Sequence, residues 1–285
     1  AYEMLRSLVG SEMCIRDSAA YEYLGRVTWT PDGAPVIQVL SRDQKSSMIL
    51  SVDVASGRTN LLRELSDPAW VELSAAPRIA PGGALVSVED VDGWRRVVVD
   101  GSPITPDGWQ IRGIVDAFED CVVVTASQDP VEVQVVRFGT DGAVTPITEG
   151  AAVHNALIGG PTTVITRSAV DAVGTTVMVH REGTEPAPIN VVSETPPHQS
   201  VIRLMKAGKH ELRTAVLLPR DHQTGSAKLP VLMDPYGGPH AQRVVASARA
   251  FLEAQWLADQ GFCVIVCDGR GTPGRGHDFE RAVQN

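Results

Sequence analysis

The sequence has few of the features that mark the specialised classes of protein. Only four of its 285 residues are cysteine, too few for the disulfide framework of a small secreted domain. No apolar run approaches the roughly 18 residues of a membrane-spanning helix. The net charge of −9 lacks the basic excess that nucleic-acid binding requires. With 43% hydrophobic and 21% charged residues, we expect a globular protein of one large or two ordinary domains.

The cysteines are not spaced for redox chemistry or metal binding. Cys263 and Cys267 enclose a short apolar run, and a spacing of four places both on the same face of a strand. No Cys-x-x-Cys pair and no further ligand lies nearby, so we expect inert, buried thiols. The sequence predicts neither a metal site nor a bound cofactor.

Neither end of the chain has the character of a native terminus. The sequence starts at Ala1 rather than at methionine, and it stops at Asn285 within a helix-like run. Residues 7–18, SLVGSEMCIRDS, resemble a translated sequencing adaptor, so we treat residues 1–18 as a foreign segment. No signal peptide is visible, and we expect a cytoplasmic protein whose native N-terminus is absent from this sequence.

Residues 19–195 have the pattern of short strands separated by turns. Eight segments are rich in valine, isoleucine and threonine, and pairs such as Asp32-Gly33 and Asp141-Gly142 separate them. No helical periodicity of comparable strength occurs in this region. The predicted strands are Val36–Leu40, Met48–Val54, Ala84–Val88, Arg95–Val99, Cys121–Thr125, Val131–Phe138, Thr163–Thr166 and Thr176–His180.

A repeat emerges when the glycines of equivalent hairpins are aligned. Gly57, Gly101, Gly142 and Gly183 are 44, 41 and 41 residues apart. A period of about 40–50 residues with four strands each is typical of the blades of a β-propeller. The sequence therefore predicts about four propeller blades, with a β-sandwich of accidental spacing as the alternative.

The pattern changes at about residue 196. Two unalternating apolar strands with a helix between them indicate a parallel sheet that is covered on both faces, which is the opening of an α/β domain. The predicted elements are the hairpin strands Val201–Met205 and Glu211–Leu218, the strand Leu229–Asp234, the helix Val244–Gln260, which ends at Gly261, and the strand Phe262–Cys267. The apolar positions of the helix are Val244, Ala248, Phe251, Leu252 and Trp256.

Two familiar motifs are matched only in part. Residues 269–274 fit Gly-x-Gly-x-x-Gly, but Pro273 and Gly276 extend the irregular stretch where a dinucleotide site needs the start of a helix. His210-Glu211 begins His-Glu-x-x-His, but Thr214 occupies the place of the second histidine. We therefore expect neither a nucleotide site nor a zinc site.

Residues 230–240, PVLMDPYGGPH, place Tyr236 and two glycines at the carboxyl end of a predicted buried strand. Ligand sites of open α/β sheets form at such strand ends. In α/β-hydrolases the turn after this strand contributes to the oxyanion hole, where glycines let the backbone approach the reacting carbonyl. A tyrosine at the rim of the core without a catalytic role explains the spacing equally well. The residues alone leave both interpretations open.

PVLMDPYGGP, followed by QWLADQGFCVIVCDGRGTPGRG, resembles the start of the catalytic domain of the prolyl oligopeptidase family, above all its dipeptidyl peptidase IV-like bacterial branch. The resemblance is strong over residues 229–284 and looser over the preceding strands, including TASQDPVEVQVVRFGTDG at 125–142. That family joins a β-propeller to an α/β-hydrolase domain. The resemblance implies a partial propeller at 19–195 and the truncated start of an α/β-hydrolase domain at 196–285.

The resemblance also implies roles for individual residues. Tyr236 would be the tyrosine whose hydroxyl helps to stabilise the oxyanion, while Asp268 and Arg270 would be structural residues near the site. The family's nucleophile lies in a Gly-x-Ser-x-Gly turn on a later strand, followed by aspartate and histidine. Ser247, within the predicted helix, cannot be that serine, so the triad is expected beyond Asn285. Paired glutamates that bind a substrate's N-terminus have no convincing match in the sequence.

The implied parent protein is a serine peptidase that acts on short peptides by acyl-enzyme chemistry, releasing N-terminal dipeptides of the Xaa-Pro type. The chain itself lacks the triad and is expected to be inactive. The alternatives are an acylaminoacyl peptidase or esterase of the same architecture, and a propeller that only binds other proteins. A peptide substrate is the expected partner, with no nucleic acid and no membrane, and a homo-oligomeric parent is left open.

The position of the last strand leads to an expectation about solubility. If the sheet stops at Phe262–Cys267, that strand exposes an apolar edge that can pair with other chains. We therefore expect the chain by itself to be poorly soluble.

Overall fold

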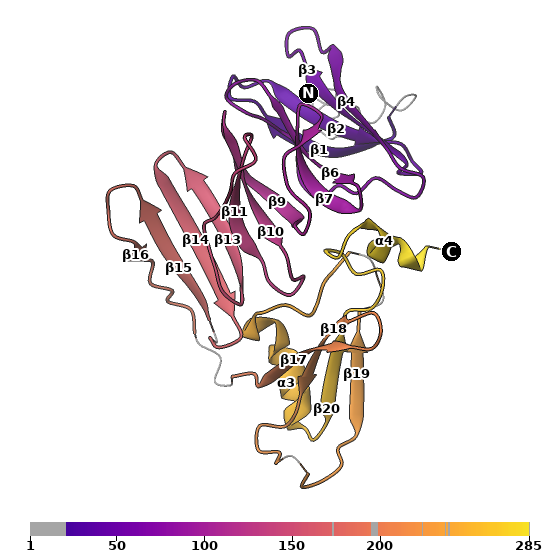
Figure 1. Ribbon diagram of the computed structural model, residues 1–285, viewed down its shortest axis with the longest axis vertical. Coiled ribbons are helices and arrows are strands. Elements are labelled where there is room, and N and C mark those ends of the chain that lie inside the picture. The colour runs from indigo at the N-terminus through magenta and orange to yellow at the C-terminus, as the bar shows by residue number, and fades with distance from the viewer. Residues whose placement is uncertain are drawn as a thin grey trace, which may run out of the picture.

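The structure, a computed structural model, describes residues 21–172, 174–194, 199–223, 225–236, 238 and 240–284. Four antiparallel sheets stand side by side like the blades of a fan, and a fifth, mixed sheet lies below them (Figure 1). The fold is a partial β-propeller followed by the first part of an α/β-hydrolase domain, as the sequence predicts. The expected foreign segment 1–18 and the expected domain boundary at 195/196 lie outside the described residues.

Each propeller sheet is a meander of four strands that neighbour one another in chain order. Blade 1 consists of β1 (Tyr23–Trp29), β2 (Pro35–Leu40), β3 (Ser46–Val52) and β4 (Thr59–Ser66), and blade 2 of β5 (Arg78–Ile79), β6 (Leu85–Val91), β7 (Trp94–Val99) and β8 (Ser102–Pro103). Blade 3 consists of β9 (Gln110–Ala117), β10 (Cys121–Ser127), β11 (Gln134–Gly139) and β12 (Val144–Pro146), and blade 4 of β13 (Ala152–Gly159), β14 (Thr162–Ala169), β15 (Thr175–Arg181) and β16 (Ala187–Pro188).

The repeated glycines occupy the same place in every blade. Gly57, Gly101, Gly142 and Gly183 each lie in the turn between the third and fourth strands. Their φ angles are 69°, 81°, 88° and 75°. Glycine adopts such positive values without strain, whereas other residues lose about 1 kcal/mol or more of stability there. The repeat read from the sequence is therefore the repeat of the blades, and the β-sandwich alternative is wrong.

The blades are held together by apolar cores between neighbouring sheets. The largest core joins blades 2 and 3, where Val97, Val124 and Phe138 are fully buried. Trp109 meets Phe138 edge to face, with ring centroids 5.8 Å apart. Smaller clusters join blade 1 to blade 2 and blade 3 to blade 4.

The sequence predicts the two central strands of every blade and misses the two outer ones. The central strands of blades 2 and 3 pack against neighbouring blades on both faces, and those of blades 1 and 4 on one face, so they are rich in valine and isoleucine. Several outer strands are very short: β5, β8 and β16 have two residues each. Their composition does not distinguish them from loops.

The fifth sheet contains both parallel and antiparallel pairs. Its order is β17-β18-β20-β19, in which β19 and β20 are parallel and the other pairs antiparallel. The strands are β17 (Ile202–Ala207), β18 (Leu212–Leu217), β19 (Val231–Pro235) and β20 (Cys263–Cys267), and the helices are η1 (Ala248–Phe251), α3 (Leu252–Asp259), α4 (His277–Glu280) and η2 (Arg281–Val283). As predicted, β19 and β20 are linked through a helix, which ends at Gly261 with a φ of 103°.

The helix is shorter than the apolar pattern predicts. Val244 to Ser247 are not helical, because the N–H of Val244 donates to the carboxylate of Asp268 and that of Ala246 to the carbonyl oxygen of Val131. These tertiary partners replace the bonds of a first helical turn. Trp256, expected on the buried face, is 60% exposed.

The expected open edge lies on a different strand. β20 pairs with β18 on one side and β19 on the other, so it is a central strand. The edge strands of the described sheet are β17 and β19, and Val231 and Met233 of β19 are 58% and 55% exposed. The helix α3 covers only the opposite face, so the expectation of a sheet covered on both faces is also wrong for the described residues. The pairing hazard belongs to β19; solubility itself remains a prediction.

The thiols of this sheet differ partly from expectation. Cys263 and Cys267 share a face of β20, as predicted, but both are only half-buried. Cys121 of blade 3 is buried, and burial raises the pKa of its thiol. Among the described helices, none is long and apolar enough to cross a membrane.

Candidate active site at the domain interface

Tyr236 lies where two parallel strands end together. Pro235 of β19 is in register with Cys267 of β20, so Tyr236 and Asp268 are the next residues on neighbouring strands. The carboxyl end of such a sheet is where α/β proteins place their ligands. Two irregular segments leave this edge: the tyrosine turn (residues 236–242) and the glycine loop (residues 269–276).

The side chain of Tyr236 folds back over Gly238. A Cβ atom at Gly238 would lie 3.0 Å from the tyrosine hydroxyl oxygen and 3.1 Å from Cζ. Cβ atoms rarely make contacts this short, so a side chain at position 238 would push the ring of Tyr236 away. Glycine avoids this contact. Tyr236 as a whole is half-buried. Gly237 lies outside the described residues.

Asp268 fixes the return of the tyrosine turn to the sheet. Its buried carboxylate accepts hydrogen bonds from the backbone N–H groups of Arg243 and Val244, both at 3.0 Å. Burial raises the pKa of Asp268, although these bonds and the nearby guanidinium groups oppose the rise. This geometry is that of a structural residue. Arg270, which the resemblance also makes structural, is exposed.

Arg243 is a residue that sequence reasoning missed. Its Nη1 and Nη2 donate to the two carboxylate oxygens of Asp234, at 2.6 and 2.7 Å. Nothing in the local pattern indicates this pair, because its members are nine positions apart and meet only through the path of the turn. The one signal in the sequence is that Asp234 comes directly before PYGGP and that Arg243, a cation, follows four residues after it.

The glycine loop packs against the propeller through backbone contacts. A Cβ at Gly276 would lie 2.6 Å from the carbonyl oxygen of Gly93, and a Cβ at Gly274 would overlap the guanidinium of Arg112. Glu280 of α4 accepts a hydrogen bond from Gly274 N at 2.8 Å and one from Arg95 Nη2 at 2.7 Å. The motif that resembles a dinucleotide fingerprint is therefore a docking segment, and Figure 1 shows α4 beneath β6 and β7.

Arg112 of β9 joins the propeller to the tyrosine turn. It donates to the carbonyl oxygen of Pro130 at 3.1 Å and to Gln242 Oε1 at 3.0 Å, and Gln242 Nε2 donates to the same carbonyl. Burial lowers the pKa of Arg112 to about 10, and the neighbouring charge of Arg95 acts in the same direction. The tyrosine turn is thus bonded to both domains.

A further set of contacts connects the end of the chain to blade 1. Asp67, which follows β4, lies 3.0 Å from His277 Nε2 and 2.6 Å from Arg281 Nη1. The Arg281 guanidinium also lies over the ring of Trp70, 5.2 Å from its centroid.

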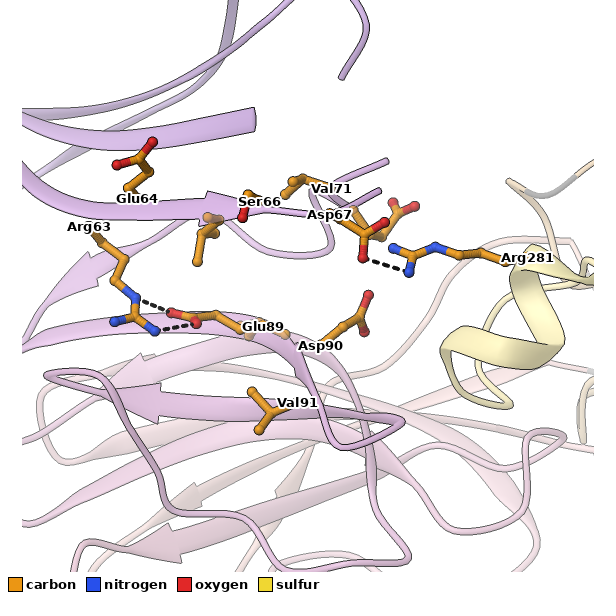
Figure 2. A pocket seen from close by; sticks show the side chains of 12 residues that line it. Arg63, Glu64, Ser66, Asp67, Val71, Glu89, Asp90, Val91 and Arg281 are labelled. Atoms are coloured by element: carbon orange, nitrogen blue, oxygen red, sulfur yellow. Dashed lines mark hydrogen bonds and ion pairs between the residues drawn. The ribbon is translucent and has the colours of Figure 1, made fainter. Parts of the chain in front are cut away.

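Two cavities lie near this interface. The smaller, of about 280 Å³, lies between blades 1 and 2, and Figure 2 shows its Arg63–Glu89 and Asp67–Arg281 ion pairs. The larger, of about 510 Å³, is lined by Tyr23, Leu40, Trp70 and Leu73 of the propeller side together with His240 of the tyrosine turn. The second cavity therefore opens beside the turn that carries Tyr236.

The other sequence candidates lie away from this arrangement. His210 and Glu211 are in the turn between β17 and β18, while Thr214 is buried in β18. Within the part of the chain that the structure describes, no three His, Cys, Asp or Glu residues are grouped to hold a metal ion. Ser247 caps η1 with extended backbone angles of −145° and 121°, rather than lying inside a helix.

Comparison with known proteins agrees with this architecture. The family model of the dipeptidyl peptidase IV N-terminal region matches residues 7–157, and that of the prolyl oligopeptidase family matches residues 248–285. The crystal structure of Porphyromonas gingivalis dipeptidyl peptidase 4 is similar, with a TM-score of 0.76 and 22% identity over 91% of this chain and 40% of that chain. This chain therefore spans less than half the length of that protein. On the matches to both parts of its fold, the chain belongs to the dipeptidyl peptidase IV-like branch of the prolyl oligopeptidase family.

Proposed function

We propose that this chain forms the junction between propeller and catalytic domain in a serine peptidase that releases N-terminal dipeptides, of the Xaa-Pro type, from short peptides. The observation that carries the proposal is the position of Tyr236. Tyr236 follows the carboxyl end of two parallel strands, on a glycine-containing turn, and His240 of the same turn lines a cavity against the propeller. The specificity draws on the family match and on the name of the similar structure.

The proposed chemistry is acyl transfer. A serine attacks the scissile carbonyl, and a histidine takes the serine proton and then gives it to the leaving amine. The carbonyl oxygen becomes an anion, and the O–H of Tyr236 donates a hydrogen bond to it. Water then hydrolyses the acyl-enzyme. We propose that the serine, aspartate and histidine of this scheme belong to a longer parent protein, and that the 285-residue chain is inactive by itself.

The cavity of about 510 Å³ is a suitable place for the peptide. Its volume falls within the range of about 300–1,000 Å³ that is usual for small-molecule sites. Aromatic and aliphatic side chains line it, and Asp43 and Glu72 add negative charge that suits a free amino terminus. A peptide is the proposed partner rather than nucleic acid or a membrane.

The test is Tyr236→Phe in the full-length protein, with Xaa-Pro p-nitroanilides as substrates. Removing one oxyanion donor costs ~10²–10³ in kcat, and we expect a loss of that order with little change in KM. Tyr21→Phe is the matched control and should leave kcat unchanged. A loss smaller than threefold in Tyr236→Phe would retire the assignment.

The substrate panel separates the proposal from its alternatives. Preference for N-acylated substrates would indicate an acylaminoacyl peptidase, and preference for p-nitrophenyl esters an esterase. Absence of turnover on every substrate by the full-length protein would favour a propeller that only binds other proteins.

A further inference from the structure

The two ends of the tyrosine turn are held by a single arginine. Asp234 comes two residues before Tyr236, and Arg243 comes one residue after the turn. The bidentate pair between them closes the turn, with N–O distances of 2.6 and 2.7 Å. Arg243 Nη1 also approaches the carbonyl oxygen of Asp234, at 3.4 Å. Hence the strand before Tyr236 and the chain after it cannot separate without breaking this contact.

The backbone of Arg243 is fixed independently of its side chain. Its N–H donates to Asp268 Oδ1 at 3.0 Å, and Asp268 is buried at the end of β20. The backbone of Arg243 is therefore held by the end of β20, and its guanidinium holds Asp234. Together these bonds fix the end of β19 relative to the end of β20. The hydrogen bonds to Asp234 also raise the pKa of Arg243, which keeps the group charged.

An ordinary surface ion pair would not carry this role. Both side chains are 32% exposed, and isolated exposed pairs contribute about 0–1 kcal/mol to stability. What distinguishes this pair is its geometry: two parallel N–H···O bonds fix orientation as well as distance. Its effect is therefore expected on the placement of the turn rather than on global stability.

We propose that Arg243 is a positioning residue that holds Tyr236 in place for oxyanion stabilisation, acting through Asp234 and Asp268. The inference rests on the proposed function of Tyr236. It does not require Arg243 to touch the substrate. Displacing a catalytic group by about 1 Å can cost about 10²-fold in rate, so a loosened turn lowers kcat even when the protein remains folded.

The test is a double-mutant cycle in the full-length protein, with Arg243→Gln and Tyr236→Phe. Arg243→Gln alone should lower kcat by roughly tenfold and change KM by less than about twofold. In the Tyr236→Phe background, the same substitution should change kcat by less than about twofold, because the group that it positions is already gone.

Three further variants keep the result interpretable. Asp234→Asn should reproduce the loss in kcat. Arg243→Lys keeps the positive charge but not the planar, bidentate guanidinium, so it should lower kcat less than Arg243→Gln does. Arg220→Gln breaks the Arg220–Asp259 pair of the same domain and should leave kcat unchanged. Because Asp234→Asn and Arg243→Lys are milder changes, they test the proposal even if Arg243→Gln fails to fold.

The outcomes separate the two hypotheses. If Tyr236→Phe leaves kcat unchanged, the proposed function fails and the role of Arg243 fails with it. If Tyr236→Phe lowers kcat but Arg243→Gln does not, only the positioning role is overturned. It is equally overturned if the two losses multiply in the double variant, since Arg243 would then act independently of the tyrosine.

Discussion

The tyrosine turn and the glycine loop leave the same edge of the sheet but use their glycines in opposite ways. In the glycine loop, Gly274 and Gly276 let backbone approach the propeller so closely that a Cβ would collide with Arg112 or with the carbonyl of Gly93. In the tyrosine turn, Gly238 leaves room for the ring of its own neighbour, Tyr236. Gly274 and Gly276 permit close contact between the domains, whereas Gly238 permits the conformation of the Tyr236 side chain.

The charges around the two segments differ in the same sense. The glycine loop is secured by Arg95 and Glu280, whose side chains are 9% and 6% exposed. The tyrosine turn is closed by the pair of Asp234 and Arg243, whose side chains are both 32% exposed. Buried pairs are costly to break, whereas exposed pairs contribute little to stability. We therefore expect substitutions in the glycine loop to affect stability and those in the tyrosine turn to affect rate.

The largest effect is expected from Glu280→Gln. Removing this carboxylate leaves Arg95 buried with Asp90 as its remaining partner, and breaking a buried pair costs about 3–5 kcal/mol. The expected result is faster amide hydrogen exchange over residues 269–283, together with a lower urea midpoint. Asp107→Asn is the control, because Asp107 pairs with Arg96 but is 79% exposed. Equal effects of the two variants would contradict the comparison.

An intermediate effect is expected from Gly276→Ala. Gly276 has φ 90° and ψ 161°, a region that is essentially restricted to glycine and costs other residues about 1–3 kcal/mol. The 2.6 Å approach to Gly93 adds a steric collision with backbone. Gly108→Ala is the control for a positive φ without a collision, because Gly108 also has a φ of 90° but nothing within 4 Å of its Cβ position. In urea unfolding, Gly276→Ala should therefore lose more stability than Gly108→Ala.

The smallest effect on stability is expected from Gly238→Ala. Its Cβ would displace the Tyr236 ring by a few tenths of an ångström, since the nearest contact would be 3.0 Å. We expect kcat of the full-length protein to fall roughly three- to tenfold, in proportion to the misplacement, and the urea midpoint to stay nearly constant. A loss of stability comparable to that of Gly276→Ala would show that Gly238 and the glycines of the loop do not differ in role.

The blade repeat could be predicted because it is written in local chemistry. Gly57 and its equivalents must adopt positive φ, and that requirement leaves glycine at a nearly constant spacing. The central strands could be predicted because their burial makes them rich in valine and isoleucine. Outer strands such as β8, which contains Pro103, could not, because pairing along one side alone demands no particular composition.

The site could be predicted only as far as its motif reached. The sequence singles out Tyr236 because PYGGP is contiguous and resembles a known family, and the role of Tyr236 as an oxyanion donor stays a prediction. The sequence does not single out Arg243, since its partners lie nine residues before it and 25 residues after it. The helix start was misplaced for the same reason, because Asp268 captures the N–H of Val244 from the far strand. Bonds between distant segments carry no local signature.

The bonds of Arg112 and Gln242 have a consequence for how such proteins diverge. Because the backbone of blade 3 accepts hydrogen bonds from Gln242 and Ala246, the propeller and the sheet are not independent modules. A chimera that exchanged only the propeller would lose Arg112, and with it a support of the turn that carries Tyr236. Substitutions in blade 3 at Arg112 or next to Pro130 are therefore expected to alter the tyrosine turn as well as the propeller.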